Sequence, residues 1–418
     1  MSPDRNRSRL AFTWGAILTS AAFAALVGTL WISSGSPSPS FVTGAFSGRG
    51  DTSVSATGDT RDQDGNGAKS ADEGLVTADP STPASATPSR TLPREILPIY
   101  AVTKTRRDVQ EELLAGKVTG NASITSAWDY ILLGRYLAID DFVDKYSAYY
   151  GTDYIWQLAA YCSESIMDPL AKGPDYDGDK GLGQVAKESE RIGRLWASDP
   201  SNPYYVDSYD PSRSVWDPET NVILSTITLR SLYALPVVTS NAIAYGHLTV
   251  GLSAVDNQGN LTQRAAARVE RAAGFVDKLI GFVGLKLAYA PSSAGGSEAE
   301  REQAEATFED TSGKLSDSVV RGLLAIDRAN ADGSPITVAL RDYFLGLSAT
   351  ANGPWNSTMY LGEAVNLARV ADEIYDIPSG VAWKAIRDRA SALSGSVYGS
   401  GDSALISYFA NINGKIPV

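Results

Sequence analysis

The feature that most constrains this 418-residue chain is an apolar run from Leu10 to Ile32 that contains no charged residue. A helix of about 23 residues is long enough to cross the roughly 30 Å hydrocarbon core of a bilayer. Three arginines precede the run, and basic residues on that flank favour a cytoplasmic N-terminus. We therefore predict that residues 1–34 form a basic cytoplasmic tip and a single-pass transmembrane signal anchor, with the rest of the chain extracytoplasmic. A cleaved signal peptide is the alternative, because residues 22–24 offer a small-x-small cleavage pattern.

Residues 35–93 are rich in Ser, Thr, Gly, Pro, Asp and Ala and contain few large apolar side chains. Such a segment buries too little surface to offset its ordering entropy, so we predict a disordered linker. Within it, Asp62, Asp64, Asn66 and Glu73 occupy positions 1, 3, 5 and 12 of an EF-hand-like calcium loop. Position 8 carries lysine instead of an apolar residue, and no amphipathic helix flanks the loop. A solvated acidic linker is therefore the favoured interpretation, and calcium binding is the weaker alternative.

Charge and rare residue types exclude several function classes. The net charge of −12 argues against nucleic-acid binding, which requires a basic face. The chain has one cysteine, Cys162, and one histidine, His247, so it has no intrachain disulfide and lacks the ligands of ordinary zinc sites. A Ser-His-Asp or Cys-His mechanism would have to use His247, and no nucleophile motif lies near that residue.

The chain from residue 94 onward has helical periodicity and few alternating Val, Ile or Thr runs, which predicts a mainly α fold. A Pro/Ser/Gly-rich stretch at 290–300 suggests a boundary between a helical domain at 94–289 and a C-terminal helical region at 290–418. The predicted helices are 107–115, 126–150, about 153–167, 217–233, 262–283, 301–310, 316–328, 336–347, 357–375, 380–394 and 402–412.

The helix predicted from Asp153 carries a candidate catalytic acid, Glu164. Asp153 suits an N-cap, and the helix should end near Met167 because Pro169 disfavours a helical conformation at the preceding residue. Glu164 then lies in the last turn, where the negative end of the helix dipole favours the protonated form that a general acid needs. An ordinary solvated glutamate is the alternative. The apolar positions expected to form the buried stripe of this helix are Ile155, Leu158, Ala159, Cys162 and Ile166.

Three further motifs follow Glu164-Ser165 along the chain. They are Gly-Leu-Gly-Gln at 181–184, Asp-Pro-x-x-Asn at 217–221 and Asn-Ala-Ile-Ala-Tyr-Gly at 241–246. In this order and spacing the set resembles the soluble lytic transglycosylase family, which is related to goose-type lysozyme. The resemblance covers roughly residues 138–285 and implies a lysozyme-like fold for the domain at 94–289.

The resemblance implies roles for individual residues. Glu164 would be the single catalytic acid, and Tyr161, one helical turn earlier on the same face, is a further substrate-binding candidate. The other substrate-binding candidates are Ser165, Gly181, Leu182, Gln184 and Tyr245. The sequence departs from the family pattern at Gly183, where the family has Met, and at Gly246, where it usually has Asn.

The activity implied by the resemblance is cleavage of the β-1,4 bond between N-acetylmuramic acid and N-acetylglucosamine in a peptidoglycan strand, with a 1,6-anhydro product and no metal or organic cofactor. A hydrolase on the same scaffold is the first alternative, in which Asp175, Asp177 or Asp179 positions a water. A non-catalytic glycan-binding scaffold is the second. Calcium binding by these three carboxylates is less favoured than a solvated loop.

Overall fold

The computed structural model describes residues 98–173, 178–312 and 315–417. Helices account for 68% of these residues and no strand is formed among them, which confirms the mainly α prediction. None of the helices in these ranges combines the length and apolarity needed to cross a membrane. The predicted span Leu10–Ile32 and the predicted calcium loop Asp62–Glu73 lie outside the described residues.

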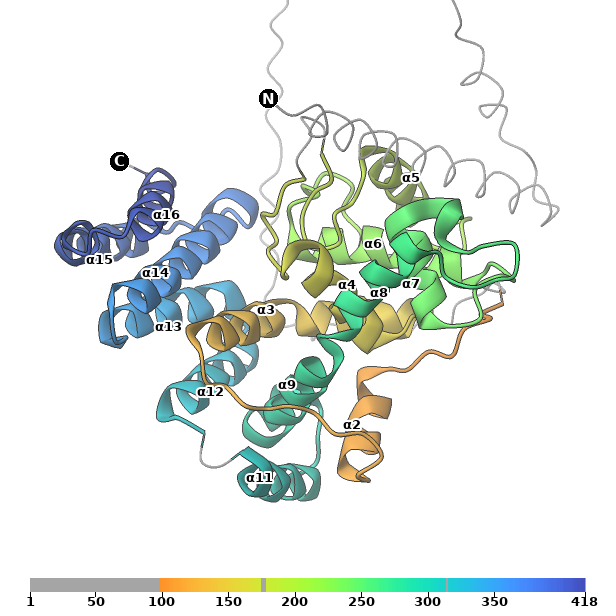
Figure 1. The fold of residues 1–418 in the computed structure, drawn as a ribbon, viewed down its shortest axis with the longest axis horizontal. Helices are drawn as coiled ribbons and strands as arrows, with labels where there is room; N and C mark the ends of the chain where they lie inside the picture. The colour runs from red at the N-terminus through yellow and green to blue at the C-terminus, as the bar shows by residue number, and fades with distance from the viewer. Residues whose placement is uncertain (1–97, 174–177, 313–314, 418) are drawn as a thin grey trace, which may run out of the picture. The chain divides into compact units, whose positions relative to one another are not determined.

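The first half of the described chain forms the helices around the candidate site (Figure 1). Capping boxes at Thr105 and Ser126 begin the first two, and the side chains of Asp153 and Asp217 cap the helices that follow them, as predicted. The elements are α2 (Arg106–Leu114), α3 (Ala127–Tyr150), α4 (Tyr154–Ser165), α5 (Lys187–Ser198), α6 (Pro218–Tyr233), α7 (Asn241–Val250), the short 3-10 helix η1 (Gly251–Ala254), α8 (Gln263–Ala273) and α9 (Val276–Tyr289).

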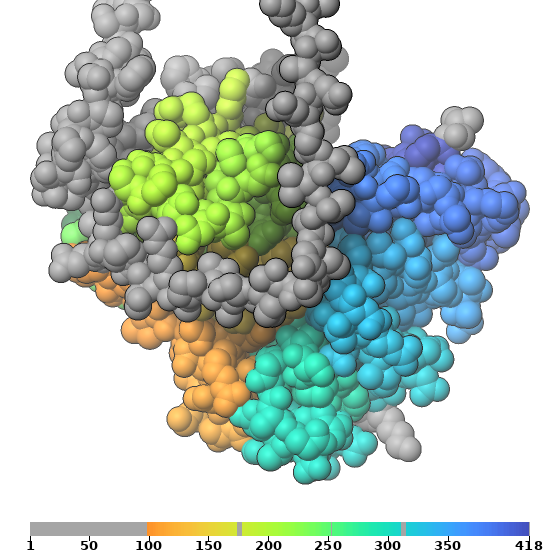
Figure 2. All heavy atoms as spheres, turned by 180° about the vertical axis from the view of Figure 1, so that it is seen from behind, coloured from red at the N-terminus to blue at the C-terminus, as the bar shows by residue number. Residues whose placement is uncertain are grey.

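The second half consists of further helices that closely follow the predicted ranges. They are α10 (Pro291–Ala294), α11 (Glu298–Ser312), α12 (Asp317–Ala331), α13 (Ile336–Thr350), α14 (Pro354–Arg369), a π turn η2 (Val370–Ile374), α15 (Gly380–Gly399) and α16 (Ser403–Asn413). Seen from behind, the surfaces of α12 to α16 form a continuous blue region (Figure 2).

Two local predictions were wrong. The single helix expected over 262–283 is divided into α8 and α9 at Gly274, which ends α8 as its C-cap. Glycine favours a helix end because fixing its backbone in a helix costs more conformational entropy than for any other residue. The predicted helices also omit α7, and α5, whose polar sequence buries only Ile192, Gly193 and Ala197.

The core surrounds α4, which is buried along nearly its whole length. Gln157, Tyr161 and Ser163 are buried together with the predicted apolar stripe, so the expectation of one buried face was wrong. The reason is that α2, α3, α7, α8 and α9 all pack against this helix (Figure 1). Ile166 is only half-buried, and Met167 takes the inward position because the chain turns after Ser165.

A buried ion cluster joins four of these helices. Asp140 on α3 is fully buried and accepts hydrogen bonds from Lys286 Nζ on α9 and Arg106 Nη1 on α2, both at 2.6 Å. Tyr154 at the start of α4 donates to the same carboxylate. Burial opposes ionisation, but Lys286 and Arg106 overcome it and hold the pKa of Asp140 below its usual value.

The buried core continues past residue 290. Phe308, Leu323 and Phe344 belong to the same apolar cluster as α4. Helix α14 contributes to two apolar clusters. Its residues Tyr360, Ala364 and Leu367 belong to the cluster that includes α4. The adjacent face of α14 packs in a second cluster with α15 and α16 through Leu361, Val365 and Ala368. The C-terminal helices are thus connected to the core around α4 through α14.

Candidate functional site

Glu164 lies in the last turn of α4, and its carboxylate meets Tyr245 of α7. The Tyr245 hydroxyl donates a hydrogen bond of 2.8 Å to Glu164 Oε1, between residues that are 81 positions apart in the chain. Tyr245 is 2% exposed. Burial, and secondarily the nearby Glu164, raise the pKa of Tyr245, so this hydroxyl keeps its proton and remains a donor.

The turn after Glu164 has an uncommon backbone conformation. Ile166 and Met167 have φ angles of 55° and 56°, in the left-handed region that β-branched and bulky residues rarely adopt. Residues held there cost about 1–3 kcal/mol each and persist only where the surroundings impose them. Backbone hydrogen bonds of 3.1 Å to Cys162 O and Tyr161 O end the helix, and Met167 is fully buried. The position of Glu164 is therefore determined by tertiary packing.

A pocket of about 260 Å³ opens beside Glu164. The residues that line it come from α4, the loop after α4, α6 and α7. They are Gln157, Ala160, Tyr161, Glu164, Gly183, Ser225, Leu229 and Leu248. Glu164 is the single carboxylic acid among these lining residues.

One wall of the pocket is a chain of buried polar groups. Gln157 Nε2 donates to the Tyr161 hydroxyl at 2.7 Å, and that hydroxyl lies 2.6 Å from Ser225 Oγ. Thr152 Oγ1 donates to Gln157 Oε1 at 3.0 Å. Because each group has a partner, the wall is fixed in orientation before any ligand arrives. These hydroxyl and amide groups bond to one another, and the surface that the pocket exposes is mainly apolar.

The Gly-Leu-Gly-Gln segment forms a tight turn against α6. Gly181 and Gln184 have φ angles of 69° and 46°. Gln184 Nε2 donates to Gly181 O at 2.8 Å and to Ala171 O at 3.3 Å, while Leu182 is fully buried in the core. Of the four residues, Gly183 lines the pocket. The side chains of Leu182 and Gln184 thus hold the turn in place, and the turn presents its backbone to the pocket.

The side chains of Asn221 and Ser165 attach this turn to the helices, and only Ser165 had a predicted role. Asn221 of α6 accepts a 2.9 Å hydrogen bond from Gly183 N and donates to Lys180 O and Val215 O at 2.9 and 3.0 Å. Ser165, predicted as a substrate contact, is buried and donates to Leu182 O at 2.8 Å. The signal for Asn221 was present in its spacing, four residues after the N-cap that starts α6.

Both departures from the resembled family occur where space is short. A Cβ on Gly183 would lie 2.5 Å from Ser225 Cβ, so a methionine at this position would collide with α6. A Cβ on Gly246 would lie 2.8 Å from Leu261 Cδ2, where α7 approaches the start of α8. The close packing of the neighbouring elements therefore accounts for glycine at both positions.

The remaining candidates lie apart from this pocket or outside the described residues. Asp175 and Asp177 are not described; Asp179 is half-buried, and its backbone carbonyl accepts a 2.7 Å hydrogen bond from Gly173 N. Cys162 is buried, as predicted, and burial raises the pKa of its thiol. His247 Nδ1 lies 3.0 Å from Gly251 O, at the end of α7. Within the described ranges no group of side chains has the composition of a metal site.

Comparison of the chain with protein-family models, with curated proteins and with solved structures gives no match.

Proposed function

We propose that this protein is a peptidoglycan-cleaving enzyme of the lytic transglycosylase type, with a lysozyme-like helical domain and Glu164 as its single acid and base. The observation that carries the proposal is the 2.8 Å hydrogen bond from Tyr245 to Glu164. The motif order had singled out both residues, and Glu164 lines a small pocket beside this hydrogen bond.

The lining of the pocket supports a mechanism with one carboxylate. Ordinary glycosidases place two carboxylates across the scissile bond. Here Glu164 is the single acid among the lining residues. Among the described residues this lining matches a mechanism in which one group acts first as acid and then as base.

In the proposed reaction, the protonated Glu164 gives its proton to the glycosidic oxygen. The bond from that oxygen to the anomeric carbon of N-acetylmuramic acid breaks, and the electron pair leaves with N-acetylglucosamine. The 6-hydroxyl of the muramic acid then attacks the anomeric carbon and returns its proton to Glu164. The product is a 1,6-anhydro sugar, no water is consumed, and the acid is regenerated. Tyr245 holds Oε1, which leaves Oε2 to carry the proton.

Replacing Glu164 by glutamine tests the proposal. Glu164→Gln keeps the shape of the side chain but removes the transferable proton, so turnover of purified peptidoglycan should fall by about 10²–10⁴-fold or more. Glu188→Gln, on the surface of α5, is the control and should leave turnover unchanged. If folded Glu164→Gln keeps more than about a tenth of the wild-type activity, Glu164 is not the acid.

Mass spectrometry of the wild-type products separates the proposed reaction from its alternatives. Anhydro ends are expected. Reducing ends would identify a hydrolase, and intact glycan with measurable binding would identify a non-catalytic scaffold.

We also propose that Leu10–Ile32 anchors the protein in the cell membrane with the catalytic domain on the cell-wall side. The uncharged length of this run supports the proposal. Protease added to intact cells should remove the C-terminal domain and leave a membrane-bound N-terminal fragment. A soluble mature protein that begins near residue 25 would refute the anchor.

A further inference from the structure

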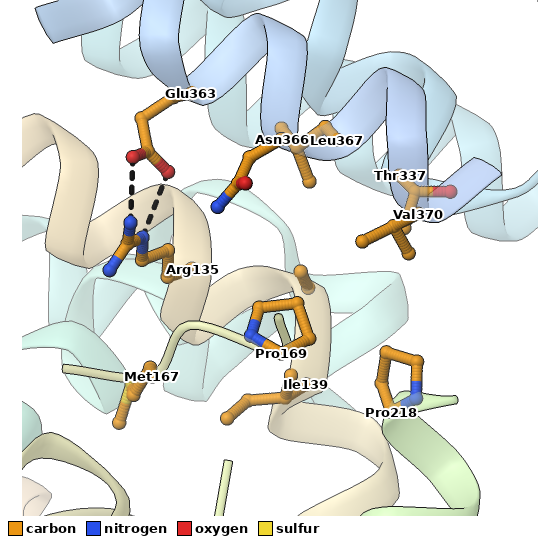
Figure 3. Close-up of a pocket in the computed structure, with 11 residues that line it drawn as sticks. Arg135, Ile139, Met167, Pro169, Pro218, Thr337, Glu363, Asn366, Leu367 and Val370 are labelled. Atoms are coloured by element: carbon orange, nitrogen blue, oxygen red, sulfur yellow. Dashed lines mark hydrogen bonds and ion pairs between the residues drawn. The ribbon is translucent and has the colours of Figure 1, made fainter. Parts of the chain in front are cut away.

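The C-terminal region, for which the sequence indicates no role, reaches the turn that follows Glu164. Its helix α14 carries Glu363, which forms a bidentate ion pair with Arg135 of α3 (Figure 3). Arg135 Nε and Nη2 donate to the two Glu363 oxygens at 2.8 and 2.7 Å. The two side chains are 12% and 7% exposed, so this pair is shielded from solvent.

The same guanidinium also reaches the backbone beside the candidate acid. Arg135 Nη1 donates to the carbonyl oxygen of Ile166 at 2.9 Å, two residues after Glu164. A second contact comes directly from α14, where Asn366 Nδ2 donates to Asp168 Oδ1 at 3.0 Å. Helix α14 therefore holds Ile166, which ends α4, through Arg135, and it holds Asp168 directly through Asn366.

Apolar packing does not make this connection alone. A narrow hollow lies between α14, α3 and the turn, and it is lined by Met167, Pro169, Asn366 and Leu367 together with the Arg135–Glu363 pair (Figure 3). The polar contacts of Arg135 and Asn366 therefore fix the turn relative to α14.

We propose that Arg135, clamped by Glu363, is a positioning residue for Glu164. By holding the Ile166 carbonyl it fixes the left-handed turn, and thereby fixes the direction in which the last turn of α4 presents Glu164 to Tyr245. This role rests on the proposed function, since it concerns the same acid. It gives the C-terminal helices a part in catalysis without contact with substrate.

The test removes both members of the buried pair, and Asp168, whose carboxylate lies 3.8 Å from Arg135 Nη2, keeps its hydrogen bond from Asn366. Arg135→Met combined with Glu363→Leu replaces the ion pair by apolar side chains of similar volume, an exchange that buried pairs often tolerate. The matched control is Arg369→Met with Glu373→Leu, because that pair has the same bidentate geometry at the end of α14 but lies on the surface.

The readout is the division between kcat and KM for peptidoglycan turnover by the full-length protein. A misplacement of about 1 Å can cost about 10²-fold in rate, so the double variant at Arg135 should lose about 10–100-fold in kcat with KM within about twofold. The control pair should change neither. A folded double variant with wild-type kcat would overturn the proposal, because a purely structural pair would behave in that way.

Arg135→Lys gives an independent measurement if the double variant does not fold. Lysine keeps the positive charge but lacks the planar guanidinium. It cannot donate two hydrogen bonds to the Glu363 carboxylate and a third to the Ile166 carbonyl at the same time. We expect the same selective loss of kcat, and unchanged kcat in this folded variant would equally overturn the proposal.

If the wild type itself does not cleave glycan, the proposed reaction fails, and the crystal structure of Arg135→Lys then decides the positioning role. Ile166 outside the left-handed region, with the Tyr245–Glu164 hydrogen bond broken, would support that role. An unchanged turn and hydrogen bond would refute it.

Discussion

Replacing Asn221 by alanine tests whether one side chain holds the Gly-Leu-Gly-Gln turn on α6. Asn221 is 1% exposed, and the substitution removes its hydrogen bonds to Gly183 N, Lys180 O and Val215 O. At about 1 kcal/mol for each bond, the loss in unfolding free energy is about 3 kcal/mol. The unfolding entropy of a unit of roughly 320 residues is about 0.7 kcal/mol/K, so Tm should fall by about 4–5 °C.

Thermal unfolding followed by circular dichroism measures this change. Asn202→Ala is the matched control, because that side chain accepts a single hydrogen bond, from Tyr204 N, in a surface turn. Its Tm should fall by less than about 2 °C. Amide hydrogen exchange at Gly183 should be faster in Asn221→Ala. A Tm no lower than that of Asn202→Ala, with unchanged exchange at Gly183, would refute the reasoning.

Two further predictions concern a buried acid and a close contact. Burial raises the pKa of Asp153 from 3.8 to about 6, so folding favours its protonated form. This contribution, on the order of 3 kcal/mol, is present below pH 3.8 and is lost as the pH rises through 6. Urea titrations should therefore show Asp153→Asn gaining stability relative to wild type over that window; parallel pH curves would contradict the shift. Gly183→Ala places a Cβ 2.5 Å from Ser225 Cβ and should cost about 1–3 kcal/mol, whereas Gly346→Ala, with open space around it, should cost nothing in the same urea titration.

Local sequence signals were sufficient for most helices. Asp153 and Asp217 begin α4 and α6 as the capping rules predict, and the C-terminal helices begin close to the predicted positions. These features depend on interactions within a few residues of the chain. The helix α5 was missed although Ile192, Leu195 and Trp196 follow a helical i, i+3, i+4 spacing within an otherwise polar segment.

The immediate environment of Glu164 was not predictable in the same way. The sequence placed Glu164 near the end of a helix and named Tyr245, but it did not indicate that the two would share a hydrogen bond. It gave one buried face to α4, whereas α2, α3, α7, α8 and α9 pack against that helix and α6 forms hydrogen bonds with it. Hydrophobic periodicity shows which residues of a helix share a face. It does not show how many other helices will pack against each face.

The sequence by itself determined the mainly α class and the caps, because these follow from local propensity, and the resemblance carried by its motifs singled out Glu164 as the candidate acid. Tertiary structure alone decided that Asn221 holds the Gly-Leu-Gly-Gln turn and that Arg135 reaches the Ile166 carbonyl. It also decided that Glu363, 228 residues after Arg135 in the chain, completes the clamp. Such contacts depend on how helices pack, and the free energy that selects one packing is shared among many side chains distant in sequence.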